Sequence, residues 1–256
     1  MGWTRVAVLS LVFTIAHFGA AAAGPITVRY AEGVTRAFPT LRSTDNEKLA
    51  QGDLTQVVRG DRVESRLVFR FKDGSLYDET VVFSQQDMFR LLSYHIVQRG
   101  PSFPETLDAA MDRSTGRYAV HYRADDDSPE EIIQGKFDIP DDAYNGMLSL
   151  VVKNLAPRTA EGPRTTDTVS IVAFTPMPRV VKLQLLPVAE DRVVVSDSPM
   201  QAVRWHIRPQ LGLLASLLVA DIPDVRLWIL PGEAPAFLRA EGPLYFMGPI
   251  WRIDPY

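Results

Sequence analysis

The chain has 256 residues, of which 27 are basic, 31 are acidic and none is cysteine, and its formal charge is −4. This nearly balanced surface lacks the positive field that binding to phosphate backbones requires, so nucleic acid is not an expected partner. The lack of cysteine excludes disulfides, thiolate catalysis and sulfur-ligated metals.

The first 23 residues have the layout of a secretory signal peptide, with basic Arg5, an apolar run from Val6 and alanines at positions 20 to 23. We expect cleavage near Ala23 and a periplasmic or secreted location in a bacterium. The alternative is an uncleaved anchor, because Val6–Ala23 is close to the shortest length that spans a bilayer. No later apolar run approaches that length, so we expect no membrane span after signal removal. Residues 24–256 are predicted to form a single β-rich domain, with 24–157 and 158–256 as alternative sub-parts.

The clearest local pattern lies in Val63–Phe71 and Leu76–Ser84. Apolar residues fall on alternate positions of the first segment, with glutamate and arginine between them and Lys72 directly after it, as in a strand that buries one face. Asp73 and Gly74 separate the two segments and suit a two-residue hairpin turn. The segments are therefore predicted to form a half-buried antiparallel hairpin.

Similar segments flank this hairpin. We predict strands at Val34–Leu41, Lys48–Val58, Met88–Gln98, Thr106–Asp112 and Arg117–Arg123. Strands joined in chain order by short turns form a meander, and a long meander twists and curls. The predicted fold class is mainly β: a long antiparallel meander curled into an open or partly closed barrel, with one or two helices packed on it.

The pattern changes after Arg123. The acidic run Ala124–Glu131 indicates a solvated loop, and Asp142–Leu155 has apolar residues at helical spacing. A second helix is predicted at Leu211–Ala220, which is apolar nearly all round. Val- and Ile-rich strands are predicted between these helices at Thr168–Thr175, Val180–Leu186, Arg192–Val195 and Ala202–Arg208, and short strands alternate with proline turns in the tail.

Motifs for catalysis are absent from the sequence: there is no G-x-S-x-G, no S-x-x-K and no glycine-rich phosphate loop. After signal removal the histidines are His95, His121 and His206, each isolated in a predicted strand. A metal site combining His121 with Asp125 or Asp127 is the alternative to packing roles. Asp78 and Glu79 are adjacent in a strand and should point to opposite faces, so they cannot flank one substrate bond. We predict no catalytic residue, no metal and no cofactor.

Large aromatic residues concentrate in the last third of the chain. Core filling is one interpretation. The other is an apolar cavity within a curled sheet too wide for its side chains to fill, with Leu211–Ala220 as a lid or plug. The residues predicted to contact a ligand are Leu214, Leu218, Trp205, Trp228 and Phe237.

The segments RLVFRFKDGSLYDETVVFSQ, HIVQRGPSFP and PGEAPAFLRAEGPLYFMGPIWRI resemble an uncharacterised family of exported bacterial β-rich proteins that has no assigned activity. The predicted architecture is also similar to the half-barrels of periplasmic lipoprotein carriers such as LolA and LolB, in which a helix plugs the concave face. The resemblance to the exported family implies an exported β protein and carries over no catalytic residue.

The leading functional hypothesis is a binding module for an apolar or amphiphilic small molecule, such as a lipid, held in the concave face of the sheet. Two alternatives remain. One is a hydrolase-type enzyme that uses strand histidines and carboxylates, and the other is a structural or assembly protein of the cell envelope. The sequence indicates no oligomeric state.

Overall fold

The computed structural model describes residues 24–125, 127–155, 167–195, 198–210 and 224–255. The predicted signal peptide 1–23 and the predicted helix Leu211–Ala220 lie outside these residues. No helix in the described part of the chain has the length and apolar character needed to cross a membrane.

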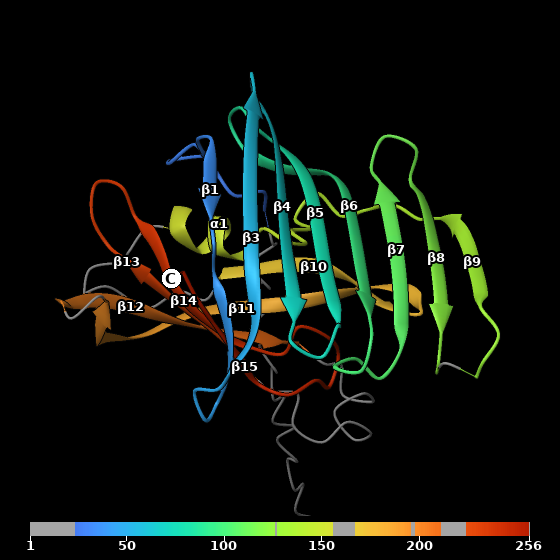
Figure 1. Ribbon diagram of the computed structural model, residues 1–256. Coiled ribbons are helices and arrows are strands. Elements are labelled where there is room, and N and C mark those ends of the chain that lie inside the picture. Colours follow the sequence, from blue (N-terminus) through green and yellow to red (C-terminus); the bar gives the residue numbers. More distant parts are fainter. Residues whose placement is uncertain (1–23, 126, 156–166, 196–197, 211–223, 256) are drawn as a thin grey trace, which may run out of the picture.

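The described chain contains fifteen strands and one helix (Figure 1). In chain order these are β1 (Thr35–Ala37), β2 (Thr40–Ser43), β3 (Lys48–Arg59), β4 (Arg62–Phe71), β5 (Leu76–Gln85), β6 (Phe89–Arg99), β7 (Thr106–Asp112), β8 (Arg117–Arg123), β9 (Glu131–Lys136), α1 (Leu148–Asn154), β10 (Asp167–Thr175), β11 (Met177–Val195), β12 (Ser198–Pro209), β13 (Val225–Leu230), β14 (Ala236–Gly242) and β15 (Trp251–Asp254).

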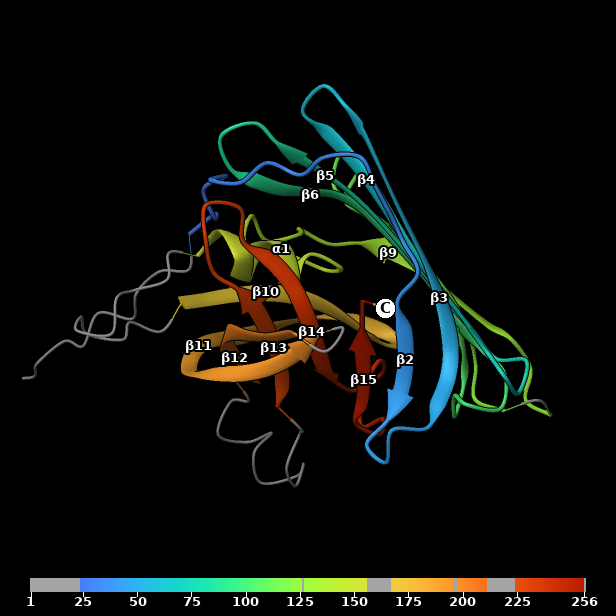
Figure 2. The same ribbon diagram turned by 60° about the vertical axis from the view of Figure 1, so that its left-hand side comes forward.

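All fifteen strands belong to one antiparallel sheet with the order β10-β11-β12-β13-β14-β15-β2-β3-β4-β5-β6-β7-β8-β9, and β1 pairs with β3. The sheet folds over on itself, so that β3–β9 form one layer and β10–β13 a second layer facing it (Figure 2). The turn between the layers is made by β14, β15 and β2. The predicted fold class, a mainly β meander curled into an open barrel with a helix on it, is confirmed.

Alternation of side chains explains the first layer. In β4, Val63, Phe69 and Phe71 are buried, while Arg66 and Arg70 are exposed. The predicted hairpin of β4 and β5 is therefore confirmed, but its turn is longer than two residues. Phe71 N–H donates to the carbonyl of Ser75, and only Gly74 has a positive φ in the turn, at 89°. A three-residue turn needs one left-handed residue where the predicted turn needs two.

Three strand predictions needed correction. The predicted strand Val34–Leu41 is divided into β1 and β2 at Pro39, which has no N–H to donate to a neighbouring strand. The two strands predicted before and after Pro187 are one strand, β11, because a register shift between Pro187 and Ala189 accommodates the proline. Strand β9 was not predicted, and its first residue, Glu131, was included in the acidic loop.

The predicted helix Asp142–Leu155 is also shorter in the structure, where α1 begins at Leu148. The preceding residues pair with β10 instead: Ser170 donates from Oγ to Asp142 at 2.9 Å, and Val172 N–H donates to Asn145 Oδ1 at 2.8 Å. Gly146, at φ 66°, lies in the turn that separates this segment from the helix.

The core fills the space between the two layers and includes Met147, Val151 and Val152 from the region of α1. The N-terminal segment is tied to this helix, because Asn154 Oδ1 accepts hydrogen bonds from the N–H groups of Arg29 and Tyr30. At the turn between the layers, rings pack against one another at centroid distances of 5.4 to 6.2 Å; they belong to Phe71, Phe103, Tyr245 and Trp251. We call these four rings the closed end.

Candidate functional site

The concave face of the first layer is apolar across seven strands. One continuous cross-strand row, from β3 to β9, consists of Leu54, Leu67, Glu79, Ile96, Ala109, Val120 and Ile133. Glu79 is its only ionisable member. The second layer and α1 cover the middle of this face, whereas β8 and β9 extend beyond the ends of β10 and β11 (Figure 1).

The barrel is open where the sheet begins and ends. Strands β9 and β10 are the two ends of the strand order and do not pair with each other. Near this gap the inner side chains become partly exposed, although those of β7 are buried. The partly exposed residues that we call the open seam are Tyr118, Tyr122, Ile133, Phe137 and Phe174.

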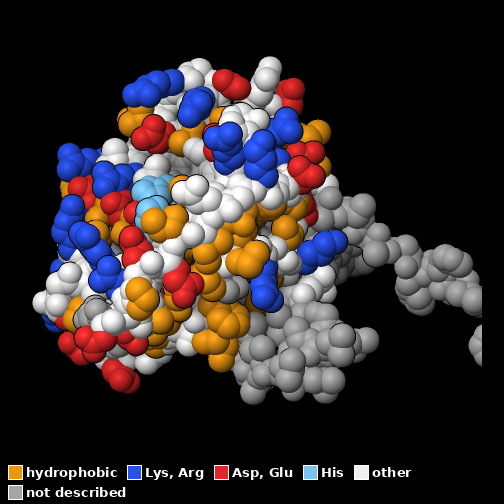
Figure 3. Space-filling model, turned by 90° about the vertical axis from the view of Figure 1, so that its right-hand side faces the viewer, with side chains coloured by type: hydrophobic (Ala, Val, Ile, Leu, Met, Phe, Trp, Pro, Cys, Tyr) orange, Lys and Arg blue, Asp and Glu red, His pale blue; other side chains and the backbone are white. Residues whose placement is uncertain are grey.

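Aromatic rings give the open seam a defined shape. Tyr118 and Phe137 meet edge to face at 5.7 Å between centroids, and Phe174 stacks parallel to Tyr94 at 6.4 Å. A hydrogen bond with the carboxylate of Glu105 raises the pKa of Tyr122, so its hydroxyl stays neutral at ordinary pH. Viewed toward β9, hydrophobic side chains gather in a band with charged groups on either side (Figure 3). The seam thus offers apolar surface together with tyrosine hydroxyls.

The residues predicted to contact a ligand lie elsewhere. Trp205 is buried in the main core, and Phe237 packs against that core. Trp228 lies on the opposite face of its layer, in a small cluster with Val193, Ala202 and Leu238, and donates from Nε1 to Asp191 at 2.8 Å. Leu214 and Leu218 are outside the described residues. The structure therefore does not bring Trp228 together with Trp205 and Phe237, and the predicted contact with a ligand remains a prediction.

Sequence reasoning missed the open seam. Tyr118 and Tyr122 were assigned to a strand, but β9, which forms the edge beside them, was not predicted. The alternation of Tyr118, Val120 and Tyr122 was the available signal for an apolar inner face. Which part of that face is left uncovered depends on how far the second layer reaches, and no local pattern records it.

Glu79 is the inward carboxylate that the strand pattern required. Asp78 pairs on the outer face with Arg66, whose Nε lies 2.9 Å from Asp78 Oδ1, and Glu79 accepts a 2.7 Å hydrogen bond from Tyr94 Oη inside the barrel. Burial raises the pKa of Glu79, and hydrogen bonds with Tyr94 and Tyr77 oppose this rise without cancelling it. The Glu79 side chain keeps some solvent contact. The opposite orientation predicted for Asp78 and Glu79 is thus seen directly.

The three histidines do not converge. His95 Nε2 lies 2.8 Å from Asp108, His121 Nδ1 lies 3.6 Å from Glu130, and both pairs are on the surface. His206 belongs to the second layer, with Nδ1 3.3 Å from Asp224, and burial lowers its pKa. Within the described residues no group of three histidine or carboxylate side chains has the geometry to hold a metal ion.

Two clefts lie away from the open seam, one at the turn between the layers and one on the second layer. The larger, of about 570 Å³, is lined by Thr44, Asp224, Arg226, Glu241, Ile250, Trp251 and Arg252. The smaller, of about 280 Å³, is lined by Leu186, Pro187, Val188, His206 and Arg208. Charged and polar side chains predominate in the larger cleft, in contrast to the apolar seam, whereas the smaller cleft is mostly apolar.

Comparison with known proteins gives a likeness of fold only. No protein-family profile and no curated protein match the sequence. Among solved structures, the chain is similar to a beta-barrel-like protein of domain of unknown function DUF1849 from Brucella abortus, with 11% identity and a TM-score of 0.43. The match covers 90% of this chain and 97% of that one. At this level the likeness assigns neither a family nor an activity.

Proposed function

We propose that the protein binds an apolar or amphiphilic small molecule, such as a lipid, without catalysis, and that the open seam is where the ligand enters the concave face. The single observation that carries this proposal is the partial exposure of inner-face aromatic and aliphatic side chains beside β9 and β10, which do not pair with each other. Uncovered apolar surface of this kind is favourable to bury, and a ligand can bury it.

The chemistry of the seam supports a ligand with both apolar and polar parts. Tyr118, Ile133, Phe137 and Phe174 offer van der Waals contact to a hydrocarbon chain. The Tyr118 hydroxyl can donate to an ester or carboxylate oxygen, whereas the O–H of Tyr122 is engaged by Glu105. An apolar pocket with a few polar groups at its edge is the usual composition of small-molecule sites. The predicted signal peptide places this activity outside the cytoplasm, as part of the same proposal.

The test compares two neighbouring residues of β9. Ile133 faces inward, whereas Ile132 faces outward and is 56% exposed. We expect Ile133→Asp to weaken binding of the fluorescent fatty acid cis-parinaric acid by about tenfold or more, because a carboxylate in the seam must be desolvated by the ligand. Ile132→Asp, which adds the same charge one residue away, should leave binding unchanged.

Native mass spectrometry of the protein purified from its own cells provides a second readout. Under the proposal the wild-type protein carries a lipid-sized adduct, and the Ile133→Asp variant does not. A wild-type protein that neither carries an adduct nor binds cis-parinaric acid would rule out the proposal. Equal losses in the two variants would show that the seam is not the binding surface.

A further inference from the structure

Arginine side chains gather on the outer face of the second layer and of the turn that joins it to the first layer. One cross-strand row contains His206, Arg226, Glu241, Arg252 and Arg42, taken from β12, β13, β14, β15 and β2 in turn. The neighbouring row places Arg204 opposite Trp228 and Trp228 opposite Arg239. We call this surface the arginine face. It is on the opposite side of the layer from the core, because the adjacent positions Trp205, Leu227 and Ile253 point inward.

The described residues of the arginine face carry more positive than negative charge. Its six arginines are Arg42, Arg204, Arg208, Arg226, Arg239 and Arg252, and the carboxylates paired with them are Asp191, Asp224, Glu241 and Asp254. Six guanidinium groups against four carboxylates leave a surplus of two positive charges. The chain as a whole has a formal charge of −4, so this surplus is local and opposite in sign to the net charge.

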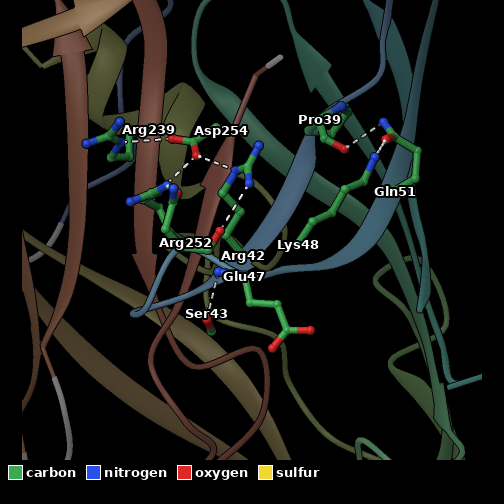
Figure 4. Close-up of polar contacts among 10 residues, drawn as sticks. Pro39, Arg42, Ser43, Glu47, Lys48, Gln51, Arg239, Arg252 and Asp254 are labelled. Atoms are coloured by element: carbon green, nitrogen blue, oxygen red, sulfur yellow. Dashed lines mark hydrogen bonds and ion pairs between the residues drawn. The ribbon is translucent and has the colours of Figure 1, made fainter. Parts of the chain in front are cut away.

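Most of the surplus lies around Asp254, where three guanidinium groups share one carboxylate (Figure 4). Asp254 is 2.9 Å from Arg239 Nε, 2.9 Å from Arg252 Nε and 3.6 Å from Arg42 Nε. These side chains are only 16 to 30% exposed, so water screens them incompletely. A single carboxylate cannot neutralise three guanidinium charges, and an additional anion would stabilise them.

The larger cleft, of about 570 Å³, opens beside this cluster. Arg252 belongs to both, because it pairs with Asp254 and also lines the cleft together with Arg226 and Thr44. Guanidinium groups bind the oxygens of a phosphate in pairs, and a threonine hydroxyl donates one further hydrogen bond. Glu241 and Asp224 also line the cleft, and they would accept hydrogen bonds from hydroxyl or ammonium groups of the same ligand. The volume is that of a small-molecule site.

We propose that the arginine face is a second binding site, for a molecule that carries a phosphate group. Arg226 and Arg252, which line the cleft, and Arg239, which pairs with Asp254 beside it, are its anion-binding residues, and Thr44 is an additional donor. The phosphate belongs either to a free small molecule or to the headgroup of a phospholipid. This site is separate from the open seam and does not depend on the function proposed for the seam, because it draws on different residues and on the other face of the layer.

The first experiment measures binding of pyrophosphate to the intact mature protein by isothermal titration calorimetry, with sodium chloride added to keep ionic strength constant. The second measures co-sedimentation of the protein with vesicles of phosphatidylglycerol, with phosphatidylcholine vesicles for comparison. Binding of pyrophosphate in the first experiment supports a free phosphorylated ligand. Binding to phosphatidylglycerol vesicles without pyrophosphate binding supports a lipid headgroup.

Variants decide whether the arginine face is responsible. Arg239→Gln and Arg226→Gln should each weaken the observed binding by about tenfold, the usual effect of losing a charge-assisted hydrogen bond. The control is Arg66→Gln, which removes the same charge from a two-bond pair with Asp78 on the outer face of β4. It should leave binding unchanged. Urea unfolding midpoints identify any variant that fails to fold. If one of the two arginine-face variants does not fold, the other serves as the binding test.

Either of two results would overturn the proposal. One is the absence of binding to both pyrophosphate and phosphatidylglycerol vesicles. The other is an equal loss of binding in Arg66→Gln and Arg239→Gln, which would show that only the net charge of the protein matters. Ile133 is not part of the arginine face, so the Ile133→Asp variant should bind phosphate normally. Loss of ligand binding at the open seam and loss of phosphate binding at the arginine face are therefore distinguishable.

Discussion

The closed end and the open seam use the same kinds of side chain for different purposes. At the closed end, Phe71, Phe103 and Trp251 are each less than 9% exposed and pack against one another. At the open seam, Tyr118 and Phe137 also meet ring to ring but remain partly exposed. Because the stabilisation from an apolar side chain scales with the area removed from water, the closed end stabilises the fold, and the seam retains surface that a ligand can bury.

The largest effect should follow from removing an aromatic ring at the closed end. Trp251→Ala is expected to lower the free energy of unfolding by about 3–5 kcal/mol, because it leaves a cavity among Phe71, Phe103 and Tyr245. Urea denaturation followed by far-ultraviolet circular dichroism measures this. The matched control is Phe246→Ala, since Phe246 is 57% exposed and its loss should change stability little. Similar losses of unfolding free energy in both variants would contradict the stabilising role of the closed end.

The next effect concerns close packing at the turn between layers. A Cβ atom on Gly52 would lie 2.7 Å from the carbonyl oxygen of Pro39 and 2.8 Å from a ring carbon of Phe69. We expect Gly52→Ala to destabilise the protein by about 1–3 kcal/mol, the usual cost of overpacking. Gly33→Ala is the control, because nothing lies within 4 Å of a Cβ atom there. Equal urea midpoints for the two variants would mean that the contact of Gly52 with Pro39 and Phe69 is loosely packed.

Removing a ring at the open seam should cost less. Phe137→Ala is expected to lower the free energy of unfolding by about 1 kcal/mol, because the ring is partly exposed before the change and its contact with Tyr118 is at the rim. The measurement is the same urea titration used for Trp251→Ala. A decrease in the free energy of unfolding as large as that of Trp251→Ala would show that the seam belongs to the structural core. The seam would then not be a surface left free for a ligand.

The smallest expected effect is on the pH dependence of stability and concerns Glu79, which lies between the closed end and the open seam. Burial raises the pKa of Glu79 above its value in the unfolded chain, so the folded protein holds this proton more tightly. Its contribution to stability is complete below the unfolded pKa and is lost as pH rises through the folded pKa. Glu79→Gln should remove that part of the pH dependence of unfolding, measured from pH 4 upward. Asp78→Asn, on the outer face, should not remove it, and an unchanged pH profile in Glu79→Gln would show that another group is responsible.

Much of the first layer could be predicted because its pattern is local. Thr106–Asp112 and Arg117–Arg123 are strands with the predicted limits, and the hairpin of β4 and β5 followed from the alternation of charged and apolar residues. The second layer was harder, because β11 accommodates Pro187 through a bulge that depends on its partner β12. The predicted helix began at Asp142, but residues 142 to 147 form turns and one bridge, which hydrogen bonds to β10 hold in place. Tertiary pairing overrode local preference there.

The candidate sites were less accessible to sequence reasoning than the fold. The inward direction of Glu79 followed from strand alternation, yet its contact with Tyr94 required the pairing of β5 with β6. The cluster around Asp254 joins Arg42 to Arg239 and Arg252, which are about two hundred positions away in the chain. No spacing rule connects such residues, because β15 and β2 become neighbours only when the sheet closes on itself.

The free border of the sheet also affects whether copies of the protein aggregate at high concentration. Exposed backbone at the margin of a sheet invites other chains to add to it and build fibrils. The margin at β10 is partly covered, because Ser170 exchanges backbone hydrogen bonds with Asp142 and Tyr144. The margin at β9 instead depends on being short and on the exposed charges of Glu131 and Lys136. Replacing those two residues with valine would leave the fold intact and turn the protein toward aggregation.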